Sequence, residues 1–323
     1  MSQRDATEPT PVRRQAAPLL GAVETGGTKV VCGVGTTPED VRVVATIPTT
    51  TPDETLRRVV DVLGPAGVTA LGIGSFGPVD LDPASATWGH ILKTTKPGWE
   101  GADVAGRLGR ALGVPVAIDT DVNAAALGEG AAGAARGVDS FVYVTIGTGI
   151  GAGVVVDGRP IRGRPHPEVG HIPTPRDPGD TFPGICAFHG DCWEGMASGP
   201  AMEARWGARA ETLPPEHPAW PVEARAIARG LATIVLTVAP RRIVLGGGVA
   251  SAPGLLPLVR AALADQLGGY VAGFDQPGFL DAYVVPPALG GRAGVAGGIE
   301  LARLGPFGGL PSEAVPRRAI REV

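Results

Sequence analysis

The chain repeats one pattern of predicted elements twice, and this duplication constrains the fold more than any other feature of the sequence. The apolar runs and turns of the first half predict strands at 19–24, 30–35 and 41–47, helix 52–64, strand 68–77, helix 101–113, strand 114–119 and helix 123–135. Residues 140–161 start again with three strands. They are followed by helices near 198–208 and 222–239, strand 242–248, helix 253–266, strand 282–287 and helix 294–304. Each half reads βββαβαβα, so we expect an α/β protein whose two duplicated domains face each other across a cleft.

Length and composition agree with two folded domains. The 323 residues suit two units of roughly 150 residues, and the 50 glycines and 32 prolines stand between apolar β-branched runs. We place the domain boundary at the segment Ala134–Asp139. The expected organisation is a disordered lead-in at 1–17, an N-terminal domain at 18–136, a C-terminal domain at 137–304 with a long loop at 163–194, and a loose tail at 305–323. The last helix is expected to pack back on the N-terminal domain.

The charge and hydropathy of the chain argue against several classes of partner. The net charge is −4 and no run of five basic residues occurs, so a nucleic-acid partner is not expected. No apolar stretch reaches the roughly 20 residues that cross a bilayer, and the polar first segment lacks the apolar core of a secretion signal. Three cysteines are too few for a disulfide framework. We therefore expect a cytoplasmic protein.

Two glycine-rich turns occupy equivalent places in the two halves and are candidate phosphate-binding turns. The first follows a strand and reads Glu24-Thr25-Gly26-Gly27-Thr28-Lys29; the second reads Gly147-Thr148-Gly149. Consecutive glycines let backbone N–H groups converge on an anion. Glu24, at the strand end, is placed to orient the waters of a Mg²⁺ ion. Each turn alone is equally compatible with an ordinary hairpin, but their matched positions favour a shared anion.

A third glycine run, Gly246-Gly247-Gly248, stands where a predicted strand feeds a helix and would allow a ligand to approach the backbone closely. It also reads as a plain strand-to-helix turn. None of the glycine runs is a Walker A loop, and no G-x-G-x-x-G opens a helix after a first βα unit. A P-loop enzyme and a Rossmann dehydrogenase are thus disfavoured.

Asp121 is the candidate catalytic carboxylate. It stands where a predicted strand hands over to a helix, in a place where it can accept a proton from a sugar hydroxyl. The alternative role is to cap that helix. Asp119 is a competing candidate for the base, although it should still lie within the strand. The loops around Gly77-Pro78 and around Lys96 are expected to close over a ligand, whereas Phe76 and Trp99 could equally belong to the core.

The long loop holds a cluster of metal-ligand residue types. Two residues separate Cys186 from His189, and two more separate His189 from Cys192. His166 and His171 precede them, and one of these histidines would complete a Cys2His2 set suited to tetrahedral Zn²⁺. Spacing alone does not decide between the two. The alternative is two unrelated thiols among surface histidines. Glu168 and Glu194 flank the cluster and could hydrogen-bond sugar hydroxyls.

In combination, these segments resemble the ROK family of repressors, open reading frames and sugar kinases. The resemblance spans residues 19–304 and is greatest to the bacterial fructokinase branch. It rests on the segments ETGGTK, GIGSFGPVD, KPGW, TDVNAAALGE, TIGTGIGAG, HPEVGH, CAFHGDCWEG, ASGPAMEARWG and LGGGV.

The resemblance implies an actin-like ATPase fold of two ribonuclease-H-like halves, a homodimer, and an ATP-dependent fructokinase that makes fructose 6-phosphate. It implies that ATP and Mg²⁺ bind between the two Gly-Thr turns, with adenosine near Gly246, Gly247, Gly248 and Val249 and with Pro200 on the nucleotide side. Asp121 matches the family's base. The implied sugar contacts are Gly77, Pro78, Asn123, Glu168, His171 and Glu194, and the implied ligands of a structural zinc are His171, Cys186, His189 and Cys192. His171 would then serve both zinc and sugar.

Three positions depart from the commoner family pattern and bear on the substrate. Glu24 stands where many members have Asp, Thr120 replaces an Asn, and His189 replaces a Cys. The last two resemble the fructokinase branch and argue against glucokinase or N-acetylmannosamine kinase. A glucokinase or mannokinase of broader specificity is the alternative enzyme, and a sugar-binding regulator without catalysis is the alternative class. Because the Pro-interrupted segment before residue 19 is short, we do not expect a repressor's helix-turn-helix domain.

Overall fold

Two five-stranded sheets with the same topology form the frame of the molecule. The computed structural model describes residues 17–164 and 166–305. The first sheet has the order β3-β2-β1-β4-β5, made of Arg42–Pro48, Lys29–Gly35, Leu20–Thr25, Ala70–Ser75 and Val116–Thr120. The second has the order β10-β9-β6-β7-β8, made of Val284–Val285, Ile243–Gly246, Phe141–Ile146, Ile150–Val156 and Arg159–Pro160. In each half the first three strands along the chain pair antiparallel with one another. The last two strands along the chain join the sheet in parallel. The expected duplicated α/β architecture is confirmed.

Among the described residues, seven helices match those that the repeat predicts, and the short helices α4 and α8 are additional. In chain order the helices are α1 Pro52–Leu63, α2 Val104–Leu112, α3 Asp121–Ala132, α4 Trp193–Ala197, α5 Gly199–Trp206, α6 Ala219–Val238, α7 Leu255–Leu267, α8 Phe279–Tyr283 and α9 Ala293–Leu304. Short 3-10 turns include η2 at Val169–His171 and η4 at Gly290–Arg292. No helix among the described residues has the length and apolar character needed to cross a membrane. The expectations for residues 1–16 and 306–323 lie outside the described residues.

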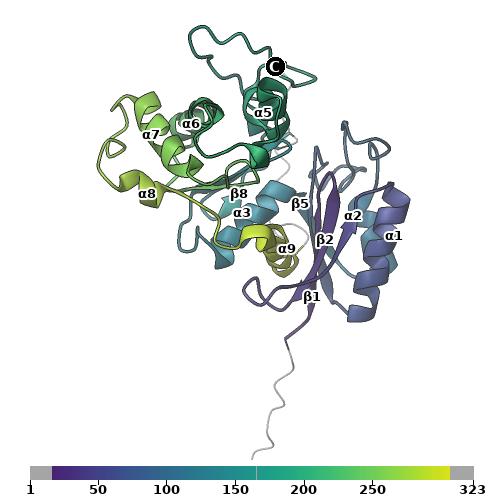
Figure 1. Cartoon of the computed structure of the whole chain (residues 1–323). Helices are drawn as coiled ribbons and strands as arrows, with labels where there is room; N and C mark the ends of the chain where they lie inside the picture. Colours follow the sequence, from purple (N-terminus) through teal and green to yellow (C-terminus); the bar gives the residue numbers. More distant parts are fainter. Residues whose placement is uncertain (1–16, 165, 306–323) are drawn as a thin grey trace, which may run out of the picture.

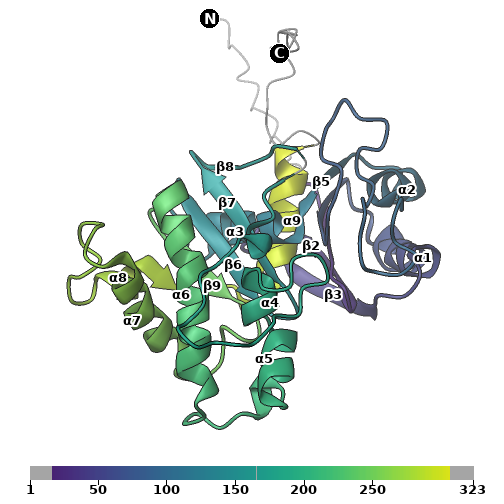
Figure 2. The same cartoon turned by 90° about the horizontal axis from the view of Figure 1, so that it is seen from above.

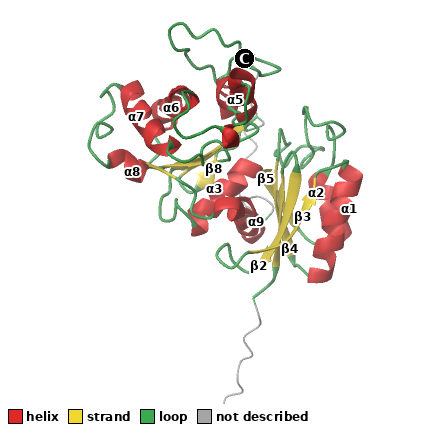
Figure 3. Cartoon of the chain, viewed as in Figure 1, coloured by secondary structure: helices red, strands yellow, loops and turns green. Residues whose placement is uncertain are grey.

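Alternating side chains send the two faces of each sheet into different cores. In β1, Val23 packs with Leu56 of α1 and Leu108 of α2, whereas its neighbour Ala22 packs with Ile299 of α9. Figure 1 shows α1 and α2 on the outer side of the first sheet, with α9 on its inner side. In the view from above, α3 and α9 lie between the two sheets (Figure 2). The helices therefore form outer layers and one shared inner layer, which the colouring by secondary structure makes plain (Figure 3).

The two inner helices tie the halves together. Helix α3, from the first half, packs Ala126 against the second sheet beside Phe141 and Val155, and α9, from the second half, covers the first sheet. Their close approach requires glycine: a Cβ on Gly297 would lie 1.6 Å from the carbonyl oxygen of Ala124. Because α3 begins at Asp121, this packing also fixes the position of the candidate base.

One predicted strand is shorter than expected. The run 282–287 gives only the two-residue β10, because the residues before it form the short helix α8. Helical spacing places Phe279 and Tyr283 on one face, where their rings stack with centroids 5.6 Å apart and both contact Phe274. The Tyr283 hydroxyl also donates a hydrogen bond of 2.9 Å to the carbonyl of Pro240. Aromatic packing therefore decides the local structure here.

Candidate active site

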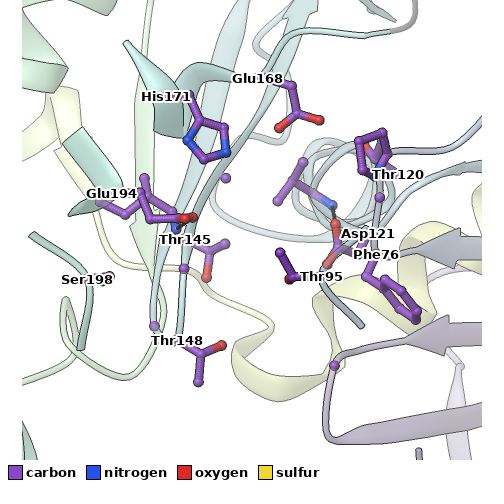
Figure 4. A pocket seen from close by; sticks show the side chains of 18 of the residues that line it. Phe76, Thr95, Thr120, Asp121, Thr145, Thr148, Glu168, His171, Glu194 and Ser198 are labelled. Atoms are coloured by element: carbon purple, nitrogen blue, oxygen red, sulfur yellow. Dashed lines mark hydrogen bonds between the residues drawn. The ribbon is translucent and has the colours of Figure 1, made fainter. Parts of the chain in front are cut away.

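A cleft with a volume of about 880 Å³ opens between the two halves. Both halves contribute to its walls, and the labelled side chains of Figure 4 surround one open space. The structure brings most of the predicted site residues to this cleft, namely Glu24, Gly26, Gly27, Thr28, Lys29, Gly77, Pro78, Asp121, Gly147, Thr148, Gly149, Glu168, His171, Cys186, His189 and Glu194.

The two Gly-Thr turns line the cleft from opposite walls. The first joins β1 to β2 and is closed by a hydrogen bond from Gly26 N–H to the Lys29 carbonyl (2.9 Å). The second joins β6 to β7 and is closed by a hydrogen bond over one residue fewer, from Gly147 N–H to the Gly149 carbonyl (2.9 Å). Equivalent turns on facing walls are the arrangement that a shared anionic ligand requires, because both can direct backbone donors toward it.

Two lysines of the segment after Pro78, Lys93 and Lys96, lie at or beside the cleft. Lys93, Thr94 and Thr95 line the cleft, and the Lys96 ammonium donates to the carbonyl of Gly27 in the first turn. The neighbouring Trp99 is fully buried and joins the core, packing edge-on against Phe76 with ring centroids 5.1 Å apart. The sequence predicts the Lys96–Trp99 segment only as a loop that closes over a ligand, because no local pattern indicates the contact between Lys96 and Gly27.

Asp121 is the first residue of α3 and faces the cleft. Thr120 caps the helix, because its hydroxyl accepts a hydrogen bond from the Asn123 N–H (3.1 Å). The Asp121 carboxylate is therefore not the helix cap. One Asp121 oxygen accepts a hydrogen bond from the Val122 N–H (2.9 Å). Burial, followed by the charge of Glu24, raises the pKa of Asp121 to about 7. A carboxylate with a pKa near neutrality can both take and release a proton under physiological conditions.

Asp119, the competing candidate, is closed off within the protein. Its side chain is fully buried, and one oxygen accepts two hydrogen bonds from the guanidinium of Arg162 (3.0 and 2.8 Å). The other accepts from the Asn123 side-chain amide (2.7 Å) and the Thr120 N–H. Asn123 is thus directed toward Asp119 beneath the cleft wall rather than among the cleft-lining side chains.

Glu24 lies at the end of β1 against α9, so close that a Cβ on Gly294 would meet its carboxylate at 2.3 Å. Burial raises the pKa of Glu24, and the Lys29 ammonium opposes that rise. Across the cleft, a Glu194 oxygen accepts a hydrogen bond from the Ile150 N–H (2.9 Å) at the start of β7. The carboxylates of the site are therefore held by elements of both halves.

The predicted metal ligands converge on one point beside the cleft. One ligand atom from each of His171, Cys186, His189 and Cys192 lies within 4.8 Å of the others. The His171 Nδ1 lies 3.5 Å from the Cys192 Sγ and 3.7 Å from the Cys186 Sγ, which in turn lies 3.7 Å from the His189 Nδ1. Two thiols and two imidazoles at this spacing fit the donor set of tetrahedral zinc.

His166, the other candidate metal ligand, lines the cleft but lies outside the metal cluster. Its Nε2 is 3.2 Å from the backbone nitrogen of Val79, and its Nδ1 is 3.4 Å from a Glu168 oxygen. The structure thus groups His171, and not His166, with the cysteines. Because His171 directs Nδ1 toward the thiols, its Nε2 remains for another partner (Figure 4).

The remaining predicted nucleotide residues lie beside the second Gly-Thr turn rather than on the cleft lining. The Val249 N–H donates to the carbonyl of Ile146 (3.0 Å), just before that turn, and the Gly199 N–H donates to the Gly147 carbonyl (2.7 Å). The strand-to-helix segment Gly246–Val249 and Pro200, in the first turn of α5, are thus placed next to Gly147.

The fold and the cleft define a duplicated α/β protein with two Gly-Thr turns and a buried aspartate, Asp121, along one cleft. Residues 20–304 match the model of the ROK family, and the chain belongs to that family. The resemblance inferred from the motifs is thereby confirmed.

Two relatives and one solved structure illustrate the similarity. A fructokinase of Pediococcus pentosaceus is 41% identical over 88% of this chain and 98% of its own length. A fructokinase of Zymomonas mobilis subsp. mobilis is also 41% identical, over 88% of this chain and 96% of its own length. The crystal structure of a ROK family glucokinase from Streptomyces griseus in complex with glucose and AMPPNP has a TM-score of 0.69 and 26% identity, covering 89% of this chain and 100% of the other. The expected fold, that of the ROK sugar kinases, is confirmed.

Proposed function

We propose that the protein is an ATP-dependent fructokinase that transfers a phosphoryl group to the 6-hydroxyl of D-fructose. The position of Asp121 between two facing phosphate-binding turns and a set of carboxylates carries the reaction type. The choice of fructose is supported by four relatives named fructokinase, which are 38% to 41% identical. A glucokinase or mannokinase of broader specificity is the second candidate, because a 28% identical relative from Streptomyces coelicolor is named glucokinase.

Glu168, His171 and Glu194 would hold the sugar, with Gly77 and Pro78 supplying the opposite wall. Carboxylates and an imidazole nitrogen accept hydrogen bonds from sugar hydroxyls, and their fixed positions would select one hexose. Asn123 belongs to this proposal only if its amide leaves Asp119, to which it now donates. In the arrangement seen, Asn123 instead steadies the first turn of α3.

Asp121 would accept the proton of the attacking hydroxyl as the phosphoryl group is transferred. Its raised pKa suits this role, because a base with a pKa near the working pH combines availability with proton affinity. The phosphoryl group itself needs alignment and charge neutralisation rather than covalent help. Backbone donors of the two Gly-Thr turns, together with Lys29 and Lys96, would supply them.

Glu24 is the residue that would orient the waters of a Mg²⁺ ion bound with ATP. Its buried carboxylate, between Lys29 and α9, is an oxygen ligand of the kind that Mg²⁺ prefers. Bound Mg²⁺ neutralises charge on the phosphates of ATP. Adenosine would lie near Gly246, Gly247, Gly248 and Val249, beside the second turn, with Pro200 next to it.

The zinc site would be structural. Four protein ligands leave no open position for a reacting group, and a metal there would fasten the Pro- and Gly-rich loop that carries Glu194 and His171. We further propose a homodimer working in the cytoplasm. The dimer follows from the ROK resemblance. The compartment is supported by the use of ATP and by cysteines that form no disulfide among the described residues.

The experiment that tests this function is a coupled assay of ADP release with ATP and Mg²⁺, run with fructose, glucose, mannose, N-acetylmannosamine and no sugar. Turnover greatest with fructose supports the proposal. Turnover greatest with glucose or mannose keeps the phosphotransferase and replaces its substrate by that of the second candidate. Folded protein that releases no ADP in response to any sugar would instead favour a ligand-binding regulator.

A further inference from the structure

The segment that leads to Glu168 belongs to the second half by sequence but is bonded to the first half. Arg162, two residues after β8, reaches Asp119 at the end of β5 with two hydrogen bonds. Four residues further on, the His166 ring reaches Val79 in the loop after β4. Both contacts cross from one half to the other on the sugar side of the cleft, so the chain is held at two points just before Glu168.

The contact of His166 with Val79 determines which ring nitrogen carries the proton. A backbone N–H can only donate, so Nε2, 3.2 Å from the Val79 nitrogen, must accept and be unprotonated. A neutral imidazole then carries its proton on Nδ1. The Nδ1 lies 3.4 Å from a carboxylate oxygen of Glu168, so the nitrogen that carries the proton is the one next to that side chain.

His166 and Glu168 differ in their exposure. The His166 side chain is 5% exposed, whereas the Glu168 side chain is 47% exposed. A half-exposed glutamate has several rotamers to lose when it binds a ligand. A buried polar neighbour that favours one rotamer reduces that loss and increases affinity. Figure 4 shows the Glu168 carboxylate beside the open space of the cleft, opposite the ring of His171.

We propose that His166 is a positioning residue for substrate: fixed by the Val79 N–H, it orients the Glu168 carboxylate toward the sugar. The inference rests on the proposed function, in which Glu168 contacts the hexose. Arg162 contributes by holding the same segment at its other anchor, the buried carboxylate of Asp119. His166 thus acts through Glu168, and replacing it affects sugar binding and not nucleotide binding.

A double-mutant cycle on sugar affinity tests this role. The dissociation constant of fructose is measured by calorimetry for the wild type, His166→Leu, Glu168→Gln and the double variant, and the KM for ATP is measured in parallel. We expect His166→Leu to weaken fructose binding about tenfold while the KM for ATP changes less than twofold. In the Glu168→Gln background the same change should have less than a twofold effect, because the group that His166 orients has lost its charge.

A merely structural role predicts a different pattern. Equal losses in both backgrounds, a parallel rise in the KM for ATP, or unchanged fructose affinity in His166→Leu would each overturn the proposal. If His166→Leu shows no cooperative melting transition, the cycle is run with His166→Gln, with an expected threefold loss that disappears in the Glu168→Gln background. Arg159→Met, at an exposed arginine of β8 without an ion pair among the described residues, is the surface control.

The cycle also separates failure of this inference from failure of the proposed function. ADP release by the wild type tests the function, whereas calorimetry needs binding alone. If another hexose of the assay panel is the substrate, the same four proteins are titrated with that hexose. A wild type that phosphorylates a hexose, combined with additive effects in the cycle, would reject the positioning role and leave the kinase intact.

Discussion

Asp119 and Asp121 stand two residues apart in the chain, but only Asp121 is available to a substrate. Asp119 ends β5 with its carboxylate fully buried among donors from Arg162, Asn123 and the Thr120 backbone. Asp121 begins α3 and lines the cleft with one backbone hydrogen bond, from Val122. The switch from strand to helix between them turns the second carboxylate toward the opening. This change from strand to helix explains why Asp119 is structural and Asp121 is the candidate base.

Asp121→Asn should abolish catalysis while preserving binding. The amide fills the same space but cannot accept the proton of the hydroxyl, so we expect kcat to fall by about 10³-fold. The coupled ADP assay measures kcat. Calorimetric titration with fructose and with an ATP analogue provides the control, and both affinities should stay within threefold of the wild type. A loss smaller than tenfold would assign proton removal to another group.

The rate should fall on the acid side of neutrality. A carboxylate with its pKa raised to about 7 is the active base only when deprotonated, so kcat/KM should be half-maximal near pH 7, level about one pH unit above it and fall tenfold per pH unit well below it. The measurement is kcat/KM with both substrates far below saturation, which reports the free enzyme. A profile level down to pH 5 would contradict the raised pKa.

Glu24→Gln should move this acid limb to lower pH. The Glu24 charge disfavours ionisation of Asp121, so its removal lets the pKa of Asp121 fall toward its ordinary value. We expect a smaller kcat, because Glu24 is also the proposed magnesium-orienting residue. The pH at which kcat/KM is half-maximal does not depend on the plateau value, so the shift can still be measured. An acid limb that stays in place would mean that burial alone sets the pKa.

Local patterns in the sequence predicted the elements and the metal cluster because the necessary residues are close in the chain. Cys186, His189 and Cys192 lie within seven positions, and each Gly-Thr turn is continuous. Contacts set by the tertiary fold could not be read in this way. The ammonium of Lys96 reaches the carbonyl of Gly27, and the His166 ring reaches Val79, across 69 and 87 positions of the chain.

Asn123 shows the same limit at short range. Its motif suggested a sugar contact, yet its amide turns to Asp119, four positions earlier, because the helix begins between them and brings the two side chains together beneath the cleft wall. A pattern of residue types identifies which side chains lie near a site. It does not tell which of them direct their polar atoms into it, since that depends on competing partners.

Cys192→Ser should remove the bound metal and loosen the loop on the sugar side. Serine is a poor zinc ligand, so we expect zinc, measured by elemental analysis, to fall from about one per chain to less than 0.2. The loop should then be cleaved faster by protease. It should not unfold entirely, because Arg176 also pairs with Asp191 and Arg205 with Asp180. Cys32→Ala, at a buried cysteine of β2 outside the cluster, should keep full zinc; equal zinc in both variants would refute the site.

Gly297→Ala should destabilise the whole protein by separating the two inner helices. The added Cβ would lie 1.6 Å from the Ala124 carbonyl oxygen, and backbone atoms of α3 cannot yield as a flexible side chain would. We expect a loss of about 3 kcal/mol or more, measured as the change in the free energy of urea unfolding. Gly291→Ala is the matched control, because a Cβ there meets no atom within 4 Å and its φ is not positive, so its stability should match the wild type. Since α3 starts at Asp121, any Gly297→Ala protein that still folds should also lose turnover, whereas the control should not. Equal stability of the two variants would show that the close packing of α3 on α9 does not hold the halves, and the base, in place.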